Sequence, residues 1–150
     1  MACTAGTTLN FVATKPNEKA GLTAFQDEKH FYFICKSVDS SKHPVVQLFK
    51  GTNNDKKMEL MAEERLAKTQ QDVRFRIVAN GANYRFEYAP VSGAWKTLKD
   101  NVDGKYLSTE VAGGFIGNVF GMYATSSGSV STNTANFKSF SYTGADSVYK

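Results

Sequence analysis

The sequence predicts an all-β fold, an antiparallel β-sandwich, on the basis of three observations. Apolar and polar residues alternate with a period of two along most of the chain, as they do on strands with one buried face. Glycine is plentiful, with 12 residues against 3 prolines, and turn-forming residues recur at short intervals. A chain of 150 residues with 41% hydrophobic content is large enough to bury the core of one domain and too small for two.

Five segments in the first half of the chain have strand-like sequences. They cover residues 7–14, 21–28, 30–38, 44–51 and 58–66. The second and third follow each other almost directly, so we expect them to pair antiparallel around a turn at residues 27–29. The loop GTNNDKK makes the fourth and fifth a hairpin. The fifth segment, MELMAEERL, is rich in helix-forming residues, but its place between two hairpins favours a strand.

The second half of the chain contains a hairpin and three further strands. The segments DVRFRIVA and YRFEYA flank residues 80–83, where Gly81 is free to adopt a positive φ. Alternation predicts one core face on this hairpin, with the intervening Arg and Glu residues facing solvent. The core set is Val73, Phe75, Ile77, Tyr84, Phe86 and Tyr88. Further strands are expected at residues 95–101, 117–124 and 135–142, which gives about ten strands in all.

Charge, hydropathy and cysteine content exclude several classes of protein. Lys and Arg exceed Asp and Glu by 18 to 14, but the basic residues are scattered and indicate no nucleic-acid-binding surface. No apolar run is long enough to span a membrane, and the first ten residues do not resemble a signal peptide, so we expect a soluble chain whose localisation stays open. Cys3 and Cys35 form no disulfide framework and are expected to be free thiols, with Cys35 buried on a strand.

Catalytic carboxyl pairs are not evident. Hydrolysis of a glycosidic bond requires two carboxyl groups that converge across a sugar. The adjacent acids Glu63 and Glu64 point to opposite faces of a strand, and the same holds for the pair at residues 27 and 28. The sequence therefore indicates no catalytic residue.

Metal and cofactor patterns are equally weak. His30 and His43 lie in turn-like positions, where we expect exposed side chains. The segment NNDKK (53–57) offers oxygen ligands but lacks the spacing of an EF-hand loop. We therefore expect neither a metal site nor a cofactor.

The order of motifs between Tyr84 and Tyr142 resembles that of a known family. The chain carries YRFEY, SGAW, YLSTEVAGGFIGNVFGMYATSSG and NTANFKSFSY in this order, preceded by AGLTAFQDE at residues 20–28. These motifs resemble the C-terminal concanavalin-like β-sandwich of glycoside hydrolase family 43, the β-xylosidase and arabinofuranosidase group. The resemblance implies a jelly-roll fold in a single module over residues 1–150 that lacks the first strands of the family.

The same resemblance implies a partner. The catalytic carboxylates of the family lie on a separate five-bladed propeller domain that precedes the sandwich, and nothing in this sequence resembles the propeller. The chain is therefore expected to be an accessory module rather than an enzyme. Two positions that are acidic in the family are Asn136 and Lys138 here, which removes acids that could serve in polar contacts or cation binding.

Aromatic side chains are the candidate ligand-binding residues. Sugar rings present C–H patches that stack on aromatic rings, and their hydroxyl groups pair with polar side chains. The candidates are Phe115, Trp95, Tyr106, Tyr84 and Tyr88. The resemblance implies that Phe115, on the loop at residues 110–118, is presented to a substrate pocket; the alternative is that it caps the core. Tyr84 and Tyr88 also suit core packing, and Trp95 also suits the edge of the core.

Two main functions follow from these expectations. One is a carbohydrate-binding module that recognises xylan, arabinoxylan or related hemicellulose. The other is a structural accessory domain that completes the active site of a partner β-xylosidase without binding sugar alone. A lectin-like or adhesion domain that shares only the scaffold is a third. The binding function requires an exposed aromatic residue on a concave sheet face, and burial of every aromatic ring would remove its support.

Overall fold

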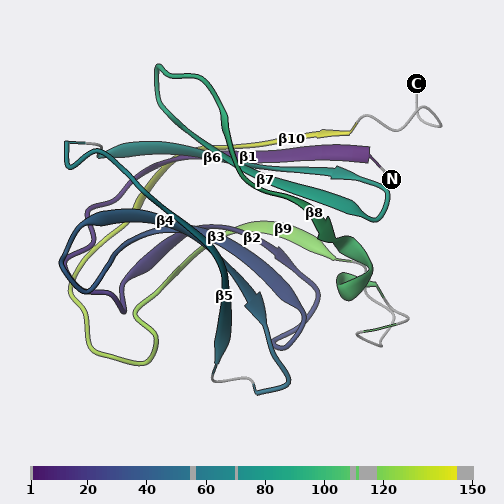
Figure 1. The fold of residues 1–150 in the computed structure, drawn as a ribbon, viewed down its shortest axis with the longest axis horizontal. Coiled ribbons are helices and arrows are strands. Elements are labelled where there is room, and N and C mark those ends of the chain that lie inside the picture. The colour runs from purple at the N-terminus through teal and green to yellow at the C-terminus, as the bar shows by residue number, and fades with distance from the viewer. Residues whose placement is uncertain (1, 55–56, 70, 109–110, 112–117, 145–150) are drawn as a thin grey trace.

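The computed structural model describes residues 2–54, 57–69, 71–108, 111 and 118–144 of the chain. Within these residues the chain forms ten strands and one short 3-10 helix, η1 (Figure 1). The elements are β1 (Ala2–Asn10), β2 (Lys19–Phe25), β3 (Phe31–Val38), β4 (Pro44–Gly51), β5 (Met58–Arg65), β6 (Asp72–Asn80), β7 (Asn83–Pro90), β8 (Lys96–Asp103), η1 (Gly104–Leu107), β9 (Val119–Thr125) and β10 (Asn136–Gly144). None of the described helical segments has the length and apolarity needed to cross a bilayer.

The strands form two five-stranded sheets that pack face to face (Figure 1). The first sheet has the order β10-β1-β6-β7-β8, and the second has the order β5-β4-β3-β2-β9. Every described pairing between neighbouring strands is antiparallel. The chain is therefore the concanavalin-like β-sandwich that the sequence predicts.

The main core lies between the two sheets. Phe75 and Ile77 of the first sheet are fully buried and belong to the same apolar cluster as Leu22, Ile34 and Leu48 of the second. Fully burying a side chain of this size stabilises a fold by about 1.5–3 kcal/mol before the cost of ordering the chain. The period-two pattern of the sequence thus has a direct physical cause, since alternate residues must reach this core.

The structure contains the two hairpins that the sequence predicts, β4–β5 and β6–β7. β6 and β7 pair along their whole length, and Gly81 in the turn has a φ of 61°. β4 pairs with β5, with one irregularity between Leu48 and Phe49. The segment MELMAEER is therefore a strand, because its pairing with β4 outweighs the helix propensity of its residues.

The first strand differs from the prediction. It covers Ala2–Asn10 rather than residues 7–14. It ends at Asn10 because the pairing with β6 ends there, at Asp72, the first residue of β6. β2 likewise ends at Phe25, three residues early, because the chain turns there. The bounds of the other strands agree with the prediction to within two residues. Residue 117, where the ninth strand was expected to begin, lies outside the described residues.

The turn between β2 and β3 corrects the expectation for its polar residues. Asp27 is not on a strand; its carboxylate accepts hydrogen bonds from the backbone N–H groups of Lys29 and His30, both at 2.8 Å. The side chain of His30 is only 14% exposed, because its Nδ1 lies 2.8 Å from Asp27 Oδ1 and its ring packs 4.9 Å from that of Tyr106. His43 is half-buried rather than exposed. The Asp27 and His30 side chains therefore stabilise the turn between β2 and β3.

Candidate functional site

Four of the five predicted ligand-binding residues lie in the described part of the chain, and the structure does not gather these four into one site. Phe115 lies outside the described residues. Tyr84 and Tyr88 are each 3% exposed. The hydroxyl of Tyr84 accepts a hydrogen bond from Asn118 Nδ2, and the hydroxyl of Tyr88 donates one to Glu64. Both tyrosines therefore pack in the core and leave no ring face for a ligand.

Tyr106 links the two sheets at one end of the sandwich. It lies on η1, directly after β8 of the first sheet. Its hydroxyl is 2.8 Å from the backbone carbonyls of both Lys29, in the turn between β2 and β3, and Gly51, at the end of β4. The ammonium of Lys50 lies 4.2 Å from the centre of its ring. These contacts account for Tyr106 as a structural residue.

Trp95 lies on the outer face of the first sheet against two arginines. The guanidinium carbons of Arg76 and Arg74 are 4.1 and 4.6 Å from its ring centre. Beside them Glu87 is 4% exposed and accepts hydrogen bonds from Arg76 and Arg85. The prediction of a solvent face is therefore wrong for Glu87, because the arginines on either side cover it. On this face Arg76 and Arg85 therefore both have a carboxylate partner in Glu87.

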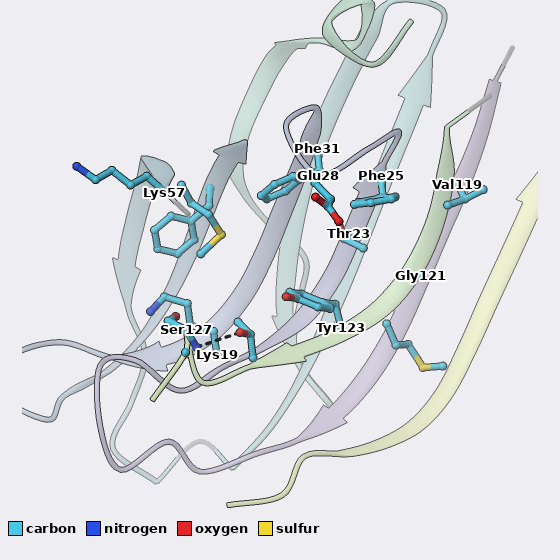
Figure 2. A pocket seen from close by; sticks show the side chains of 15 residues that line it. Lys19, Thr23, Phe25, Glu28, Phe31, Lys57, Val119, Gly121, Tyr123 and Ser127 are labelled. Atoms are coloured by element: carbon cyan, nitrogen blue, oxygen red, sulfur yellow. Dashed lines mark hydrogen bonds between the residues drawn. The ribbon is translucent and has the colours of Figure 1, made fainter. Parts of the chain in front are cut away.

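A groove lies on the outer face of the second sheet, with a volume of about 1050 Å³ (Figure 2). Its lining residues on β2 and β3 alternate with the core residues of the same strands, which places them on the opposite side of the sheet. The lining includes Lys19, Thr23, Phe25, Glu28, Phe31, Phe49, Lys57, Met58, Val119, Gly121, Met122, Tyr123, Thr125, Ser127 and Gly128. This hollowed face, with the aromatic side chains Phe25, Phe31, Phe49 and Tyr123 among its lining residues, is the candidate binding site.

Tyr123 is the exposed aromatic ring of this groove. It is 47% exposed, and its ring packs edge-on against the fully buried Phe33, with 5.1 Å between the centres. Between these two residues lies β2, where Gly21 is the cross-strand neighbour of Tyr123. A Cβ atom at Gly21 would lie 1.9 Å from the Ile34 carbonyl oxygen. The glycine thus allows β2 to approach β3 closely and lets the Tyr123 ring cross above it.

Polar side chains occur at both ends of the groove: Lys19 and Ser127 mark one end, and Glu28 lies beside Phe25 and Phe31 at the other (Figure 2). Tyr123 lies between the two ends. Lys19 is 9% exposed; its ammonium donates to the Pro16 carbonyl and lies 5.5 Å from the centre of the Phe49 ring. Burial lowers the pKa of Lys19. A partly desolvated cation of this kind is a strong hydrogen-bond donor to a ligand oxygen.

The sequence contained a signal for this groove in β3. Tyr32 and Ile34 face the core, while the alternate residues Phe31, Phe33 and Cys35 face the groove side. A strand that is apolar on both faces indicates that both faces are covered. Cys35 is fully buried there, and both cysteines are free thiols, as predicted.

The arrangement suits binding better than hydrolysis. Among the described residues, Glu28 is the one carboxylate that lines the groove. Glu63 accepts a hydrogen bond from Gln47, whereas Glu64 accepts one from Tyr88 of the first sheet, so the pair diverges as expected. The described side chains also contain no group of three His, Cys, Asp or Glu residues that could hold a metal ion. Residues 55 and 56 of the NNDKK segment lie outside this description.

Known proteins share both the sequence pattern and the fold. The family model of the β-xylosidase C-terminal concanavalin A-like domain matches residues 1–143. The non-reducing end α-L-arabinofuranosidase BoGH43B of Bacteroides ovatus is 32% identical over 141 residues, which are 93% of this chain and 25% of that protein. A solved structure described as Bacteroides ovatus xyloglucan PUL GH43B superposes with a TM-score of 0.85, at 28% identity, over 95% of this chain and 27% of that one.

A more distant structure shows the same fold. The xylan β-1,4-xylosidase of Bacillus halodurans superposes with a TM-score of 0.84 at 18% identity, over 95% of this chain and 28% of that one. In each of these comparisons the chain spans about a quarter of the relative's length. The chain belongs to the family of β-xylosidase C-terminal concanavalin A-like domains, found in glycoside hydrolase family 43.

Proposed function

We propose that this chain is a non-catalytic carbohydrate-binding module that recognises xylan or related hemicellulose, attached to the catalytic propeller of a family 43 glycoside hydrolase. The observation that carries the proposal is Tyr123, a half-exposed aromatic ring on a hollowed sheet face. This is the feature that the binding function requires and a purely structural domain does not.

The groove offers both kinds of contact that a sugar needs. The exposed ring of Tyr123 provides a surface for the C–H face of a sugar, and Lys19, Thr125 and Ser127 provide polar groups for hydroxyls. Its volume of about 1050 Å³ suits several linked sugar units, since pockets for drug-sized ligands have about 300–1,000 Å³. Binding through one ring and a few hydrogen bonds is weak, and attachment to an enzyme on the same polymer strengthens it by avidity.

The relatives support the choice of ligand and partner. Their names specify an α-L-arabinofuranosidase and a xylan β-1,4-xylosidase, and the second name includes the proposed ligand, xylan. Each relative is about four times as long as the matched region, which leaves room for a catalytic domain in a shared chain. By the family resemblance, Phe115 is a further proposed contact, at the mouth of that enzyme's active site.

Isothermal titration calorimetry against soluble xylan, arabinoxylan and a cellulose-type control tests the proposal. We expect binding to the first two, a loss of about tenfold in affinity in Tyr123→Ala, which is about 1.4 kcal/mol, and no change in Trp95→Ala. Absence of heat with every polysaccharide would reject the binding function. Equal loss in both variants would reject the groove as its site.

A second candidate function is favoured by the seam between β9 and β10. Met122 and Tyr142 lie opposite the core residues Leu22 and Ala5 in their sheets, yet they are 47% and 55% exposed. Phe140 on the same edge is 42% exposed. Tyr142 packs against Phe120, with 6.3 Å between the ring centres, but apolar side chains that stay about half exposed suit contact with another domain. The seam thus supports the accessory function, in which the sandwich packs on a partner catalytic domain.

Association in trans tests this second function. The chain is mixed with the isolated catalytic portion of the Bacteroides ovatus relative, and binding is measured by analytical ultracentrifugation. Docking through the seam predicts a complex that Tyr142→Ser weakens and Tyr123→Ala does not. A wild-type chain that stays monomeric in the mixture would count against it.

A further inference from the structure

One end of the groove is built from two segments that are far apart in the sequence. Lys19, at the start of β2, pairs with Thr125 at the end of β9, and Ser127 and Gly128 follow in the turn beyond β9. All four residues line the groove, and Figure 2 shows Lys19 and Ser127 at the same end of it. We call the end formed by Lys19, Thr125 and Ser127 the polar end, because each of these side chains carries a polar group. Its shape depends on how the turn after β9 is held.

The turn after β9 has a backbone conformation that serine rarely adopts. The N–H of Ser129 donates to the Ser126 carbonyl at 3.1 Å, which closes a turn over residues 126–129. Its two central residues, Ser127 and Gly128, both have positive φ, at 54° and 83°. Glycine adopts this left-handed conformation freely, but it is unfavourable for serine, because the Cβ atom crowds the backbone. Contacts with neighbouring residues are therefore needed to hold Ser127 in it.

The strained residue lies at the groove. The described part of the chain has three non-glycine residues with positive φ, namely Lys42, Asn101 and Ser127, and of these Ser127 lines the groove. Residues in sparsely populated backbone conformations cluster at functional sites, where the surrounding structure fixes them. The conformation of Ser127 therefore points to a role in the groove.

Asn17 makes two contacts that hold this turn. Its side-chain Nδ2 donates to the Ser126 carbonyl at 3.1 Å, and its backbone carbonyl accepts from Ser127 Oγ at 3.2 Å. The Ser127 N–H is bonded in turn to Thr125 Oγ1, at 3.0 Å. Asn17 lies just before β2, which begins with Lys19, so it connects the turn to the strand that carries the lysine. Asn17 thus sets the position of Ser127 relative to Lys19.

The same bonds fix which polar groups the polar end offers. The hydroxyl hydrogen of Ser127 is directed to Asn17, so the lone pairs of Oγ are left to accept. The ammonium of Lys19 carries three donor hydrogens, of which one is directed to the Pro16 carbonyl. One segment therefore supplies a donor and the other an acceptor. A sugar hydroxyl both donates and accepts, and it bonds to the two together only while their separation is fixed.

We propose that Asn17 is a positioning residue for the carbohydrate site. It holds Ser127 in the left-handed conformation beside Lys19, so that both reach one hydroxyl of the ligand. Without the Asn17 amide, Ser127 relaxes to a negative φ and its Oγ leaves this position. Asn17 does not line the groove and acts through Ser127. This inference rests on the proposed carbohydrate-binding function and adds a residue to it.

Asn17→Ala tests the proposal, with Asn133→Ala as the matched control. Asn133 lies in the same connection between β9 and β10, and its Nδ2 donates to the Val12 carbonyl at 2.7 Å and to Glu18 at 3.0 Å. Its loss removes hydrogen bonds from the loop without releasing Ser127. We expect Asn17→Ala to lower the affinity for xylo-oligosaccharides about fivefold in calorimetry, equivalent to about 1 kcal/mol, the contribution of one neutral hydrogen bond. Asn133→Ala should bind like wild type.

NMR of the free protein supplies a readout that does not depend on binding. A positive φ brings the amide and α protons of a residue close together and gives a strong intraresidue cross-peak in a NOESY spectrum. We expect this cross-peak for Ser127 in wild type and in Asn133→Ala, and a much weaker one in Asn17→Ala. If Asn17→Ala does not fold, Asn17→Asp, which keeps the shape and loses the donor, replaces it.

The outcomes separate this inference from the proposed function. A full-strength Ser127 cross-peak in the Asn17 variant would overturn the positioning role. Unchanged affinity in that variant, or an equal loss of affinity in Asn133→Ala, would overturn it too and leave carbohydrate binding intact. Absence of binding by the wild-type chain would overturn both proposals.

Discussion

The two outer faces of the sandwich both carry an aromatic residue close to basic side chains, but they are built in different ways. On the first sheet, Trp95 lies against Arg74 and Arg76. Arg76 pairs with the buried Glu87, and Arg74 donates to the backbone carbonyls of Pro90 and Gly93. On the second sheet, Tyr123 rests on the buried Phe33 and leaves half of its surface exposed above a groove. Among the described residues, the groove with its half-exposed Tyr123 ring lies on the second face.

This difference teaches how to distinguish a structural aromatic residue from a binding one. The Trp95 ring lies against two arginines of its own sheet, which occupy part of its surface in the free protein. Tyr123 makes an edge-on contact with Phe33, and the exposed part of its ring is accessible to a ligand. The type of residue alone would favour Trp95, since tryptophan has the larger ring. The surroundings of the two rings instead favour Tyr123 as the ligand-binding residue.

The largest effect is expected from the backbone of the groove. In Gly21→Ala the new Cβ would lie 1.9 Å from the Ile34 carbonyl oxygen, so β2 must move away from β3. We expect a loss of about 3 kcal/mol in the free energy of unfolding, measured by urea denaturation. Gly121→Ala is the matched control on the same face, because no atom lies within 4 Å of its Cβ position. Equal stability of the two variants would contradict this account of the groove.

The second largest loss of stability is expected from Glu87, the buried carboxylate on the outer face of the first sheet. Glu87→Ala leaves Arg76 and Arg85 without their shared partner, and we expect a loss of about 2 kcal/mol, reduced from the value for a fully buried pair because the arginines are partly exposed. Xylan affinity should not change. A loss of xylan affinity in Glu87→Ala would mean that the two faces are not independent.

The loops at the polar end of the groove depend on Glu18. This buried carboxylate accepts hydrogen bonds from the Thr14 backbone at 2.7 Å, Ser131 at 2.8 Å and Asn133 at 3.0 Å. Burial alone would raise its pKa, but these hydrogen bonds outweigh burial and lower the pKa to about 2. Its ionised form therefore stabilises the fold fully above pH 4.5, and this contribution is lost as the pH falls towards 2.

Glu18→Gln tests this assignment. We expect a loss of about 1–2 kcal/mol at neutral pH, because the amide accepts fewer of these hydrogen bonds, and a difference from wild type that shrinks between pH 4.5 and 2. Glu28→Gln, on an exposed turn, serves as the control and should match wild type at neutral pH. A constant difference across the acid range, measured by denaturation at each pH, would show that Glu18 is not ionised in the folded protein.

The smallest effect is expected at Trp95. Trp95→Ala removes two cation–π contacts at a partly exposed site, so we expect a loss of about 1 kcal/mol in stability and unchanged xylan affinity. Thermal and urea denaturation measure the first quantity, and affinity electrophoresis measures the second. A large drop in xylan affinity in a folded Trp95→Ala variant would reverse the comparison between the faces.

Most of the fold was predictable because it follows from local patterns. Alternation located the strands, and Gly81 identified the β6–β7 turn. The first strand was misplaced because its bounds depend on pairing with β6, which lies more than sixty residues away in the sequence. The burial of Glu87 was missed for the same reason, since its partner Arg76 lies on a neighbouring strand.

The groove was less predictable than the fold. Tyr123 lies in a segment whose alternation alone does not distinguish the core face from the outer face of an edge strand. Its exposure depends on Gly21 and Phe33, which reach it only through the pairing of β9 with β2 and β3. The apolar run of β3 was the available local signal. Sequence reasoning instead singled out Tyr84 and Tyr88, whose rings the sandwich buries.

The most direct test of the central claim is an NMR titration of the ¹⁵N-labelled chain with xylo-oligosaccharides. A glycan site on the second sheet predicts amide shift changes that cluster at Lys19, Thr23, Tyr123 and Ser127 and that are absent around Trp95 and Arg76. Shift changes centred on the outer face of the first sheet, or none at saturating oligosaccharide, would contradict it.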